Sequence, residues 1–226
     1  KNIPNGKKKI AVIEEFITEG VDSGVRNVVD NAIRLYEKSG YVIEKISLPM
    51  IKYALAIYYV VIPAEISSNL SRYDGIRYGN RAEGLMGLEE VYAKTRSNGF
   101  MPENKRRIMI GNYVLSSGYF DAYYQKAQKA RTLLIKEFTK ALDNYDALIG
   151  PVAPTPAFKI GSKSSDPLMM YLEDIMTVPA SLAGLPAISV PAGSSEGMPV
   201  GLQLIGKQKD DANILSLARI LEETEK

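Results

Sequence analysis

The hydrophobic pattern of the first fifty residues predicts a strand, a helix and a second strand. A short apolar run at 10–13 is typical of a buried strand. Apolar residues then recur at helical spacing across 25–36, after an N-cap candidate at Asp22 and before Gly40, which suits a left-handed helix end. The β-branched-rich segment 41–48 is the predicted second strand. Strand, helix and strand at this spacing indicate a βαβ unit.

The middle of the chain has the spacing of helices. Residues 50–72 are apolar on nearly every side near their centre, which predicts a buried helix that Pro63 kinks or breaks. Turn residues at 73–79 end this segment. Three further helices are predicted at residues 88–97, 102–117 and 119–142.

The last third of the chain alternates strands and helices. A strand at 146–150 leads into a proline-rich loop at 151–156, at the strand end where open α/β sheets place ligands. No repeat or long flexible linker divides the sequence, so residues 1–226 are expected to form a single α/β domain. The remaining predicted elements are a helical segment at 168–182, strands at 187–190 and 200–205, and a helix at 210–225.

The sequence contains neither cysteine nor histidine, which excludes several chemistries. A disulfide framework, a thiolate metal site, a cysteine nucleophile and a Ser-His-Asp triad all need residues that the 226 positions lack. Carboxylates, amines and hydroxyls remain, but no serine lies in a Gly-x-Ser-x-Gly turn. The net charge of +2 is too small to indicate nucleic-acid binding by bulk charge.

Composition also bears on location. The lack of cysteine suits a reducing cytoplasm. The longest apolar run, at 53–64, has about a dozen residues, short of the ~20 that span a bilayer. We therefore expect a soluble, cytoplasmic chain that does not contact a membrane. The sequence opens on Lys1 instead of methionine, which suggests a piece of a longer protein.

A cluster of cations, Lys105-Arg106-Arg107, stands at the start of a predicted helix. Cations there oppose the helix dipole, and a bound anion would offset that cost. An arginine offers a rigid, two-pronged donor for a carboxylate or a phosphate. The alternative is that these are three solvated surface charges.

A second candidate is Asp174, which stands with Glu173 in an otherwise apolar helical segment. Adjacent positions point about 100° apart on a helix, so one of the two is expected to face inward and to need a cationic partner. The alternative is the boundary of an amphipathic helix. Together, an arginine and an aspartate have the charges to hold the α-carboxylate and the α-ammonium of a free amino acid.

Several stretches of sequence are recognisable. They lie at 67–79, 105–109, 115–124, 150–158, 166–168, 178–191 and 199–206. Through these stretches the chain resembles, over nearly its whole length, the C-terminal half of the A subunits of glutamyl-tRNA(Gln) amidotransferases, members of the amidase signature family. The stretches 178–191 and 199–206 are shared by that wider family, and the others are more specific to the tRNA-dependent subunits.

The resemblance implies the C-terminal portion of the amidase signature fold, a mixed β-sheet flanked by helices. It also implies that the family's catalytic set, a serine nucleophile, a bridging serine and a lysine base, precedes the region seen here. No residue of this chain is therefore given a catalytic role, and the chain is expected to be inactive alone.

The glutamine-binding residues of the family carry over to Tyr58, Arg107 and Asp174. Tyr59 is the neighbour with which Tyr58 could be confused by a register slip of one. The implied chemistry is hydrolysis of glutamine through an acyl-enzyme, with the ammonia passing to a partner subunit that amidates glutamyl-tRNA.

The resemblance further implies the B and C subunits as partners, tRNA contact mainly through a partner, and no cofactor in this chain, since ATP and Mg²⁺ are used by the partner subunit. Two alternatives remain. One is part of a general amidase. The other is a non-catalytic scaffold that binds partner subunits or tRNA through segment 81–101 or the basic face of the 119–142 helix.

Overall fold

The computed structural model describes residues 8–18, 20–162 and 167–224. Its contacts divide the chain into two compact units, one made of Lys1–Leu55 with Arg131–Lys226 and the other of Ala56–Ala130. Each unit is described by itself. The expectation of a single domain over 1–226 remains a prediction.

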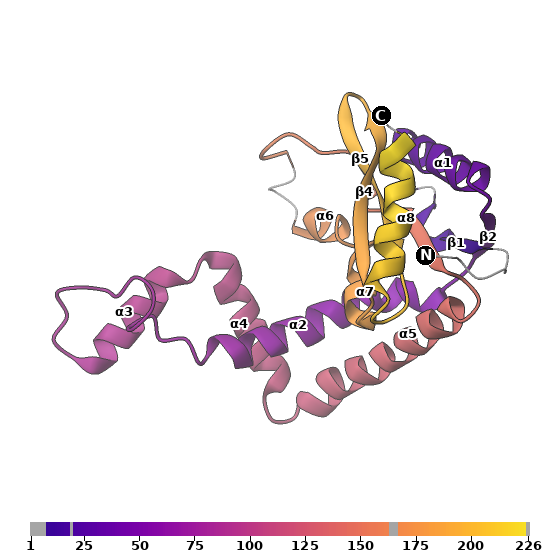
Figure 1. Ribbon diagram of the computed structural model, residues 1–226. Helices are drawn as coiled ribbons and strands as arrows, with labels where there is room; N and C mark the ends of the chain where they lie inside the picture. The colour runs from indigo at the N-terminus through magenta and orange to yellow at the C-terminus, as the bar shows by residue number, and fades with distance from the viewer. Residues whose placement is uncertain (1–7, 19, 163–166, 225–226) are drawn as a thin grey trace. The chain divides into compact units, whose positions relative to one another are not determined.

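The first unit is built on a five-stranded sheet (Figure 1). Its strand order is β2-β1-β3-β5-β4, with β1 parallel to both β2 and β3, and with β5 antiparallel to β3 and β4. The predicted mixed sheet and the parallel βαβ unit are confirmed. The strands are β1 (Lys9–Ile13), β2 (Val42–Ile46), β3 (Ala147–Pro151), β4 (Ala187–Ser195) and β5 (Met198–Ile205).

Two helices, α1 (Ser23–Lys38) and α8 (Asp211–Thr224), pack against one face of this sheet. Asp22 caps α1 as predicted, because its carboxylate accepts hydrogen bonds from the amides of Gly24 and Val25. The buried cluster between the helices and the sheet includes Ile10, Val12, Val29, Tyr36, Ile149, Leu202, Leu204, Leu217 and Leu221.

Leu202 and Leu204 face that cluster, so strand alternation turns Gln203 to the opposite face of the sheet. The remaining elements of the unit are 3₁₀ turns at Glu14–Phe16 and Pro49–Tyr53, and the short helices α6 (Pro167–Leu172) and α7 (Val178–Ala183). The predicted helical segment 168–182 is thus wrong at its centre, where residues 173–177 form a turn between α6 and α7.

Strand β4 is longer than predicted. It runs through Pro191 to Ser195, and its pairing with β5 shifts between Pro191 and Gly193. A proline is tolerated at this position because β4 is an edge strand, whose outward amides have no ladder partner.

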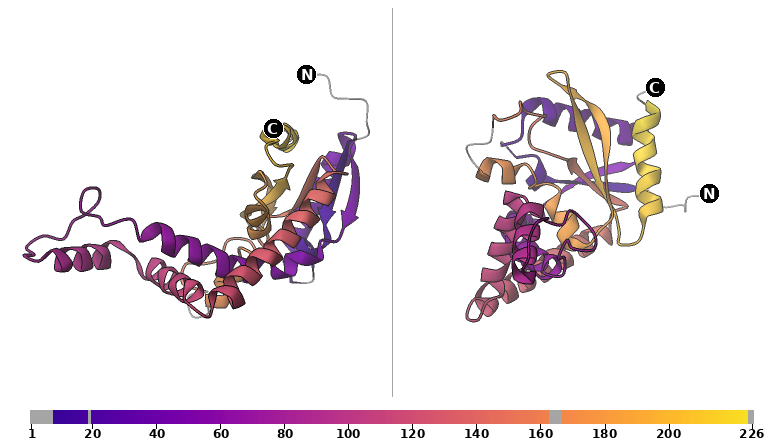
Figure 2. Two further views of the ribbon diagram at one scale, coloured as in Figure 1. Left: turned by 90° about the horizontal axis from the view of Figure 1, so that it is seen from below. Right: turned by 90° about the vertical axis from the view of Figure 1, so that its left-hand side faces the viewer.

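The second unit is helical, and Figure 2 shows α3 and α4 as successive helices in it. Pro63 does not break α2, which continues through that residue, while the alternative expectation of a kink there stays a prediction. The predicted helix at 119–142 begins as a π-helical turn at Phe120–Gln125 before α5. The helices are α2 (Ala54–Leu70), α3 (Leu88–Gly99), α4 (Pro102–Leu115) and α5 (Lys126–Leu142), of which α2 and α5 connect the two units in sequence.

The helix α2 is also less buried than its composition predicts. Ala56 and Glu65 are exposed, and Tyr58 to Val60 are only half-buried. By length and composition alone, the helical segment Pro49–Leu70 is long and apolar enough to cross a membrane, although its uninterrupted apolar run is the shorter one at 53–64. This property is weak evidence for a membrane, because core helices of soluble proteins share it.

The Glu44 carboxylate on strand β2 hydrogen-bonds to Lys9 of β1 and to Tyr145, and it makes the free energy of unfolding depend on pH. Its carboxylate accepts hydrogen bonds from Lys9 Nζ at 2.8 Å and from the Tyr145 hydroxyl at 2.6 Å. These bonds hold the pKa of Glu44 below its ordinary value. Since the folded state binds this proton less tightly than the unfolded state, the carboxylate stabilises the fold above the ordinary glutamate pKa and loses that contribution as the pH falls.

We expect Glu44→Gln to lower the free energy of unfolding at neutral pH and to have a diminishing effect towards acid pH. Urea unfolding over a pH series checks this, with Glu37→Gln, an exposed glutamate on α1, as the control. A difference that stays constant from neutral to acid pH would contradict the assignment.

Candidate functional site

Tyr58 and Arg107 meet in the second unit, although 49 positions separate them in the sequence. Tyr58 lies on α2 and Arg107 on α4, and Arg107 Nη1 donates a hydrogen bond to the Tyr58 hydroxyl at 3.3 Å. The guanidinium carbon is 6.0 Å from the Tyr58 ring centroid and 5.9 Å from that of Tyr59. Both rings are near the cation, but the hydrogen bond distinguishes Tyr58.

The two helices approach closely because α4 has a glycine at the contact. A Cβ at Gly111 would lie 2.6 Å from the carbonyl carbon of Pro63 and 2.6 Å from Ser67 Cβ. Next to this contact, the Ser67 hydroxyl donates to Asn112 Oδ1 at 2.5 Å. Gly111 therefore allows the packing that brings Arg107 to Tyr58.

The cation cluster at the start of α4 has a counter-ion within its own helix. Glu103 Oε1 accepts a hydrogen bond from Arg107 Nε at 2.9 Å, and Glu103 Oε2 lies 3.4 Å from Arg106 Nη1. Glu103 therefore supplies negative charge at this helix end, and the cations alone do not require a bound anion. The sequence signal was present, since glutamate precedes Arg107 by four positions.

Arg107 combines partial burial with a fixed charge. Its side chain is 22% exposed. Burial disfavours the charged form, but the hydrogen bonds to Glu103 and Tyr58 outweigh burial and raise the pKa of Arg107 above its ordinary value. The guanidinium is thus a permanently charged, oriented donor of the kind that binds a carboxylate.

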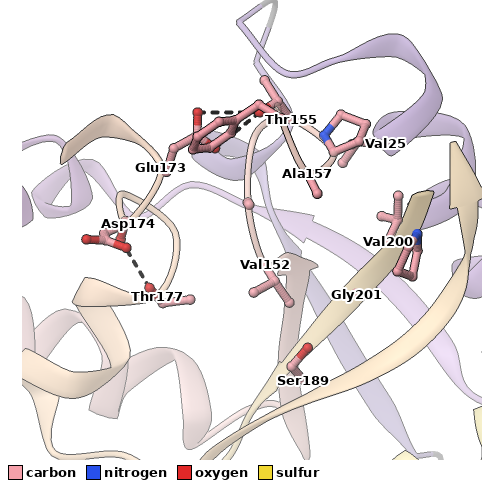
Figure 3. Close-up of a pocket in the computed structure, with 14 residues that line it drawn as sticks. Val25, Val152, Thr155, Ala157, Glu173, Asp174, Thr177, Ser189, Val200 and Gly201 are labelled. Atoms are coloured by element: carbon pink, nitrogen blue, oxygen red, sulfur yellow. Dashed lines mark hydrogen bonds between the residues drawn. The ribbon is translucent and has the colours of Figure 1, made fainter. Parts of the chain in front are cut away.

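Asp174 belongs to the first unit, in the turn between α6 and α7. It lines a cavity of about 400 Å³ together with Thr155, Glu173, Thr177 and Ser189 (Figure 3). This cavity lies beside the proline-rich loop after β3, at the strand end where the sequence predicted a ligand site. Gly201 also lines this cavity, and a side chain there would collide with Ser189, because a Cβ would lie 2.7 Å from Ser189 Oγ.

The expected helix is wrong for this pair, while the expectation that one of the two carboxylates faces inward towards a cation stays a prediction. Asp174 is exposed, and no ion pair recorded among the described residues includes it. Glu173 is half-buried and accepts a hydrogen bond from the Thr155 hydroxyl, whose oxygen is 3.2 Å from Glu173 Oε2. The reason is local: residues 173–177 form a turn, so helical spacing does not set their directions.

The structure thus brings two of the three predicted residues together and places the third on a cavity of its own unit. Sequence reasoning missed Glu103 and Thr155 as partners. In the parts of the chain that the structure describes, no group of three or more acidic residues is arranged to hold a metal ion.

Known proteins are similar to this chain in sequence and in fold. The family model named Amidase matches residues 1–215. The chain belongs to the amidase family. The resemblance found in the sequence is confirmed, and so is the expected class of fold.

Within the amidase family, the chain is similar to the A subunits of glutamyl-tRNA(Gln) amidotransferases. It is 54% identical over 215 residues to that of Geobacillus kaustophilus, covering 95% of this chain and 44% of the relative. It is 51% identical over 216 residues to that of Streptococcus sanguinis, again covering 44% of the relative. The chain thus spans less than half the length of the curated relatives it matches.

Two solved structures have a similar fold. The crystal structure of the glutamyl-tRNA(Gln) amidotransferase A chain from Thermotoga maritima matches with a TM-score of 0.73 and 41% identity, covering 96% of this chain and 42% of that one. A crystal structure described only as an amidase matches with a TM-score of 0.73 at 23% identity, which supports the fold alone.

Proposed function

We propose that this amidase-family chain is the glutamine-binding portion of a glutaminase subunit that supplies ammonia for converting glutamyl-tRNA(Gln) to glutaminyl-tRNA(Gln). The observation that carries the proposal is the hydrogen bond from Arg107 to Tyr58, two of the residues that the resemblance assigns to glutamine. Identities above 50% to curated A subunits support the same assignment.

In this proposal the residues that the resemblance assigns to glutamine bind its charged ends. Arg107, fixed by Glu103 and Tyr58, binds the α-carboxylate through its guanidinium donors. Asp174 accepts hydrogen bonds from the α-ammonium. A simple aliphatic amide lacks both charged groups, so this pair would select a free amino acid.

The hydrolytic step is assigned to residues outside this chain. In this proposal the serine nucleophile, bridging serine and lysine base implied by the resemblance are not among the 226 residues, and the partner B and C subunits would receive the ammonia and use ATP and Mg²⁺. We expect tRNA to bind mainly to a partner, and the assembly to be cytoplasmic.

The purified 226-residue chain is therefore expected to release no ammonia from glutamine. A coupled ammonia assay checks this, and calorimetric binding of glutamine to the same preparation separates a folded, inactive chain from a misfolded one. Turnover of glutamine by the chain alone would refute the assignment of catalysis to residues outside it.

A non-catalytic scaffold is the second candidate, and the exposure of segment 81–101 favours it. Met86 is fully exposed, and Leu88 and Met101 are 72% and 73% exposed, so apolar side chains in and beside this segment are available to a partner. Co-purification with partner subunits, without protection of any amide by glutamine in hydrogen exchange, would favour the scaffold over the glutamine-binding portion.

A further inference from the structure

The turn that carries Asp174 has weak internal support. Most of its backbone bonds span three residues, such as those from Asp174 N to Tyr171 O at 3.3 Å and from Ile175 N to Leu172 O at 3.2 Å. Bonds of this 3₁₀ type have poorer geometry than those of an α-helix. The direction of the Asp174 carboxylate therefore depends on what anchors the turn from outside.

One anchor comes from the middle of the sheet. Gln203 lies on β5, opposite Gly150 of β3 and Ser189 of β4, and it is 4% exposed. Its Nε2 donates a hydrogen bond to the main-chain carbonyl of Met176 at 2.9 Å. This bond joins the rigid sheet to the turn, two residues after Asp174.

The chemistry of this position requires a donor. Met176 is 3% exposed, so the hydrogen bond that its carbonyl accepts from the Gln203 amide is a buried one. A buried polar group without a partner is costly, and an apolar side chain at 203 would leave the Met176 carbonyl in that state. The turn would then shift towards water or another donor.

A second hydrogen bond holds the turn at Glu173. The Thr155 hydroxyl, on the loop after β3, donates to the carboxylate of Glu173. Asp174 follows directly, and its own carbonyl accepts from Val178 N at 3.1 Å and from the Thr177 hydroxyl at 3.2 Å (Figure 3). Asp174 thus lies between two residues that other segments hold by hydrogen bonds. Glu173 is held by Thr155, and Met176 is held by Gln203.

We propose that Gln203 is a positioning residue for Asp174: by holding the Met176 carbonyl, it fixes the turn that directs the Asp174 carboxylate at the α-ammonium of glutamine. The inference rests on the proposed function and extends it to a residue of the sheet. Gln203 does not touch the ligand, and it acts only through the turn.

The test uses Gln203→Met, which keeps the length of the side chain and removes the donor, and Leu204→Met as the matched control on the same strand. Hydrogen exchange is measured at the amides of 173–178, and glutamine affinity is measured by calorimetry. Gln203→Met should speed exchange in the turn and weaken glutamine binding up to about tenfold, while Leu204→Met should do neither.

A double-mutant cycle with Asp174→Asn separates positioning from general destabilisation. If Gln203 acts through Asp174, Gln203→Met should have no further effect on glutamine affinity in the Asp174→Asn background. Additive losses would overturn the proposal, as would exchange in the turn no faster than in Leu204→Met.

The single variant Asp174→Asn tests the proposed function separately from the positioning role of Gln203. If that variant binds glutamine as the parent does, Asp174 is not a glutamine ligand, and the positioning role falls with it. If Asp174→Asn weakens binding and Gln203→Met does not, the proposed function stands and the positioning role is refuted.

Discussion

Replacing Arg107 with alanine is expected to weaken glutamine binding by at least about 30-fold. Truncating one partner of a hydrogen-bonded charge pair costs about 2–5 kcal/mol, and the α-carboxylate would lose its main cationic partner. The loss should exceed that of an average surface arginine, because Arg107 is partly buried and is oriented by Glu103 and Tyr58. Titration calorimetry of the 226-residue chain with glutamine measures the change.

The neighbouring residue supplies a matched control. Arg106 also approaches Glu103, but at 3.4 Å and with a side chain that is 53% exposed. Arg106→Ala should leave the affinity for glutamine within about twofold, since exposed ion pairs contribute little. Equal losses in the two variants would mean that the cluster acts only through its overall charge, and the assignment of Arg107 would be wrong.

Gly111→Ala is expected to lower the free energy of unfolding by about 1–3 kcal/mol, the usual cost of forcing an extra methyl group into a close contact. The new Cβ would collide with the Pro63 main chain and with Ser67, so α2 and α4 would have to separate. Their separation would pull Arg107 away from Tyr58, and glutamine affinity should fall with stability. Urea denaturation and calorimetry measure the two effects.

Gly99→Ala is the control for this substitution. Gly99 ends α3 in the same unit, and a Cβ there would meet no atom within 4 Å. It should therefore be neutral or slightly stabilising, because alanine favours helix more than glycine does. A Gly111→Ala variant as stable as Gly99→Ala would show that the helices do not depend on this close approach.

The parts of the fold that the sequence predicted are those governed by short-range patterns. The cap at Asp22, the left-handed Gly40 and the parallel pairing of β1 with β2 follow from capping rules and hydrophobic spacing, and the structure has all three. The strands at 187–190 and 200–205 were also predicted, although β4 continues through Pro191 to Ser195.

The parts that the sequence did not predict depend on contacts between distant segments. The exposure of Ala56 and Glu65 on α2 depends on what packs around the helix, which an apolar composition does not reveal. Similarly, the turn at 173–177 replaces a helix that its apolar spacing favoured, and Gln203 and Thr155 bind that turn from other segments.

For the candidate site, too, the sequence predicted some features and the structure added others. The glutamine-binding roles of Tyr58, Arg107 and Asp174 came from a family resemblance, and spacing alone could not pair these residues. The structure adds the hydrogen bond between Arg107 and Tyr58, and it adds Glu103 as the internal counter-ion that the cation cluster needed. That counter-ion weakens the argument from helix dipoles, so the case for a bound carboxylate rests on the oriented guanidinium.

The central claim is that this amidase-family chain recognises the charged ends of free glutamine. Titration of the 226-residue chain with glutamine and, separately, with butyramide tests it most directly, because butyramide keeps the amide and lacks both charged groups. We expect saturable binding of glutamine and none of butyramide at the same concentrations. Equal binding of the two amides, or binding of neither, would contradict the claim.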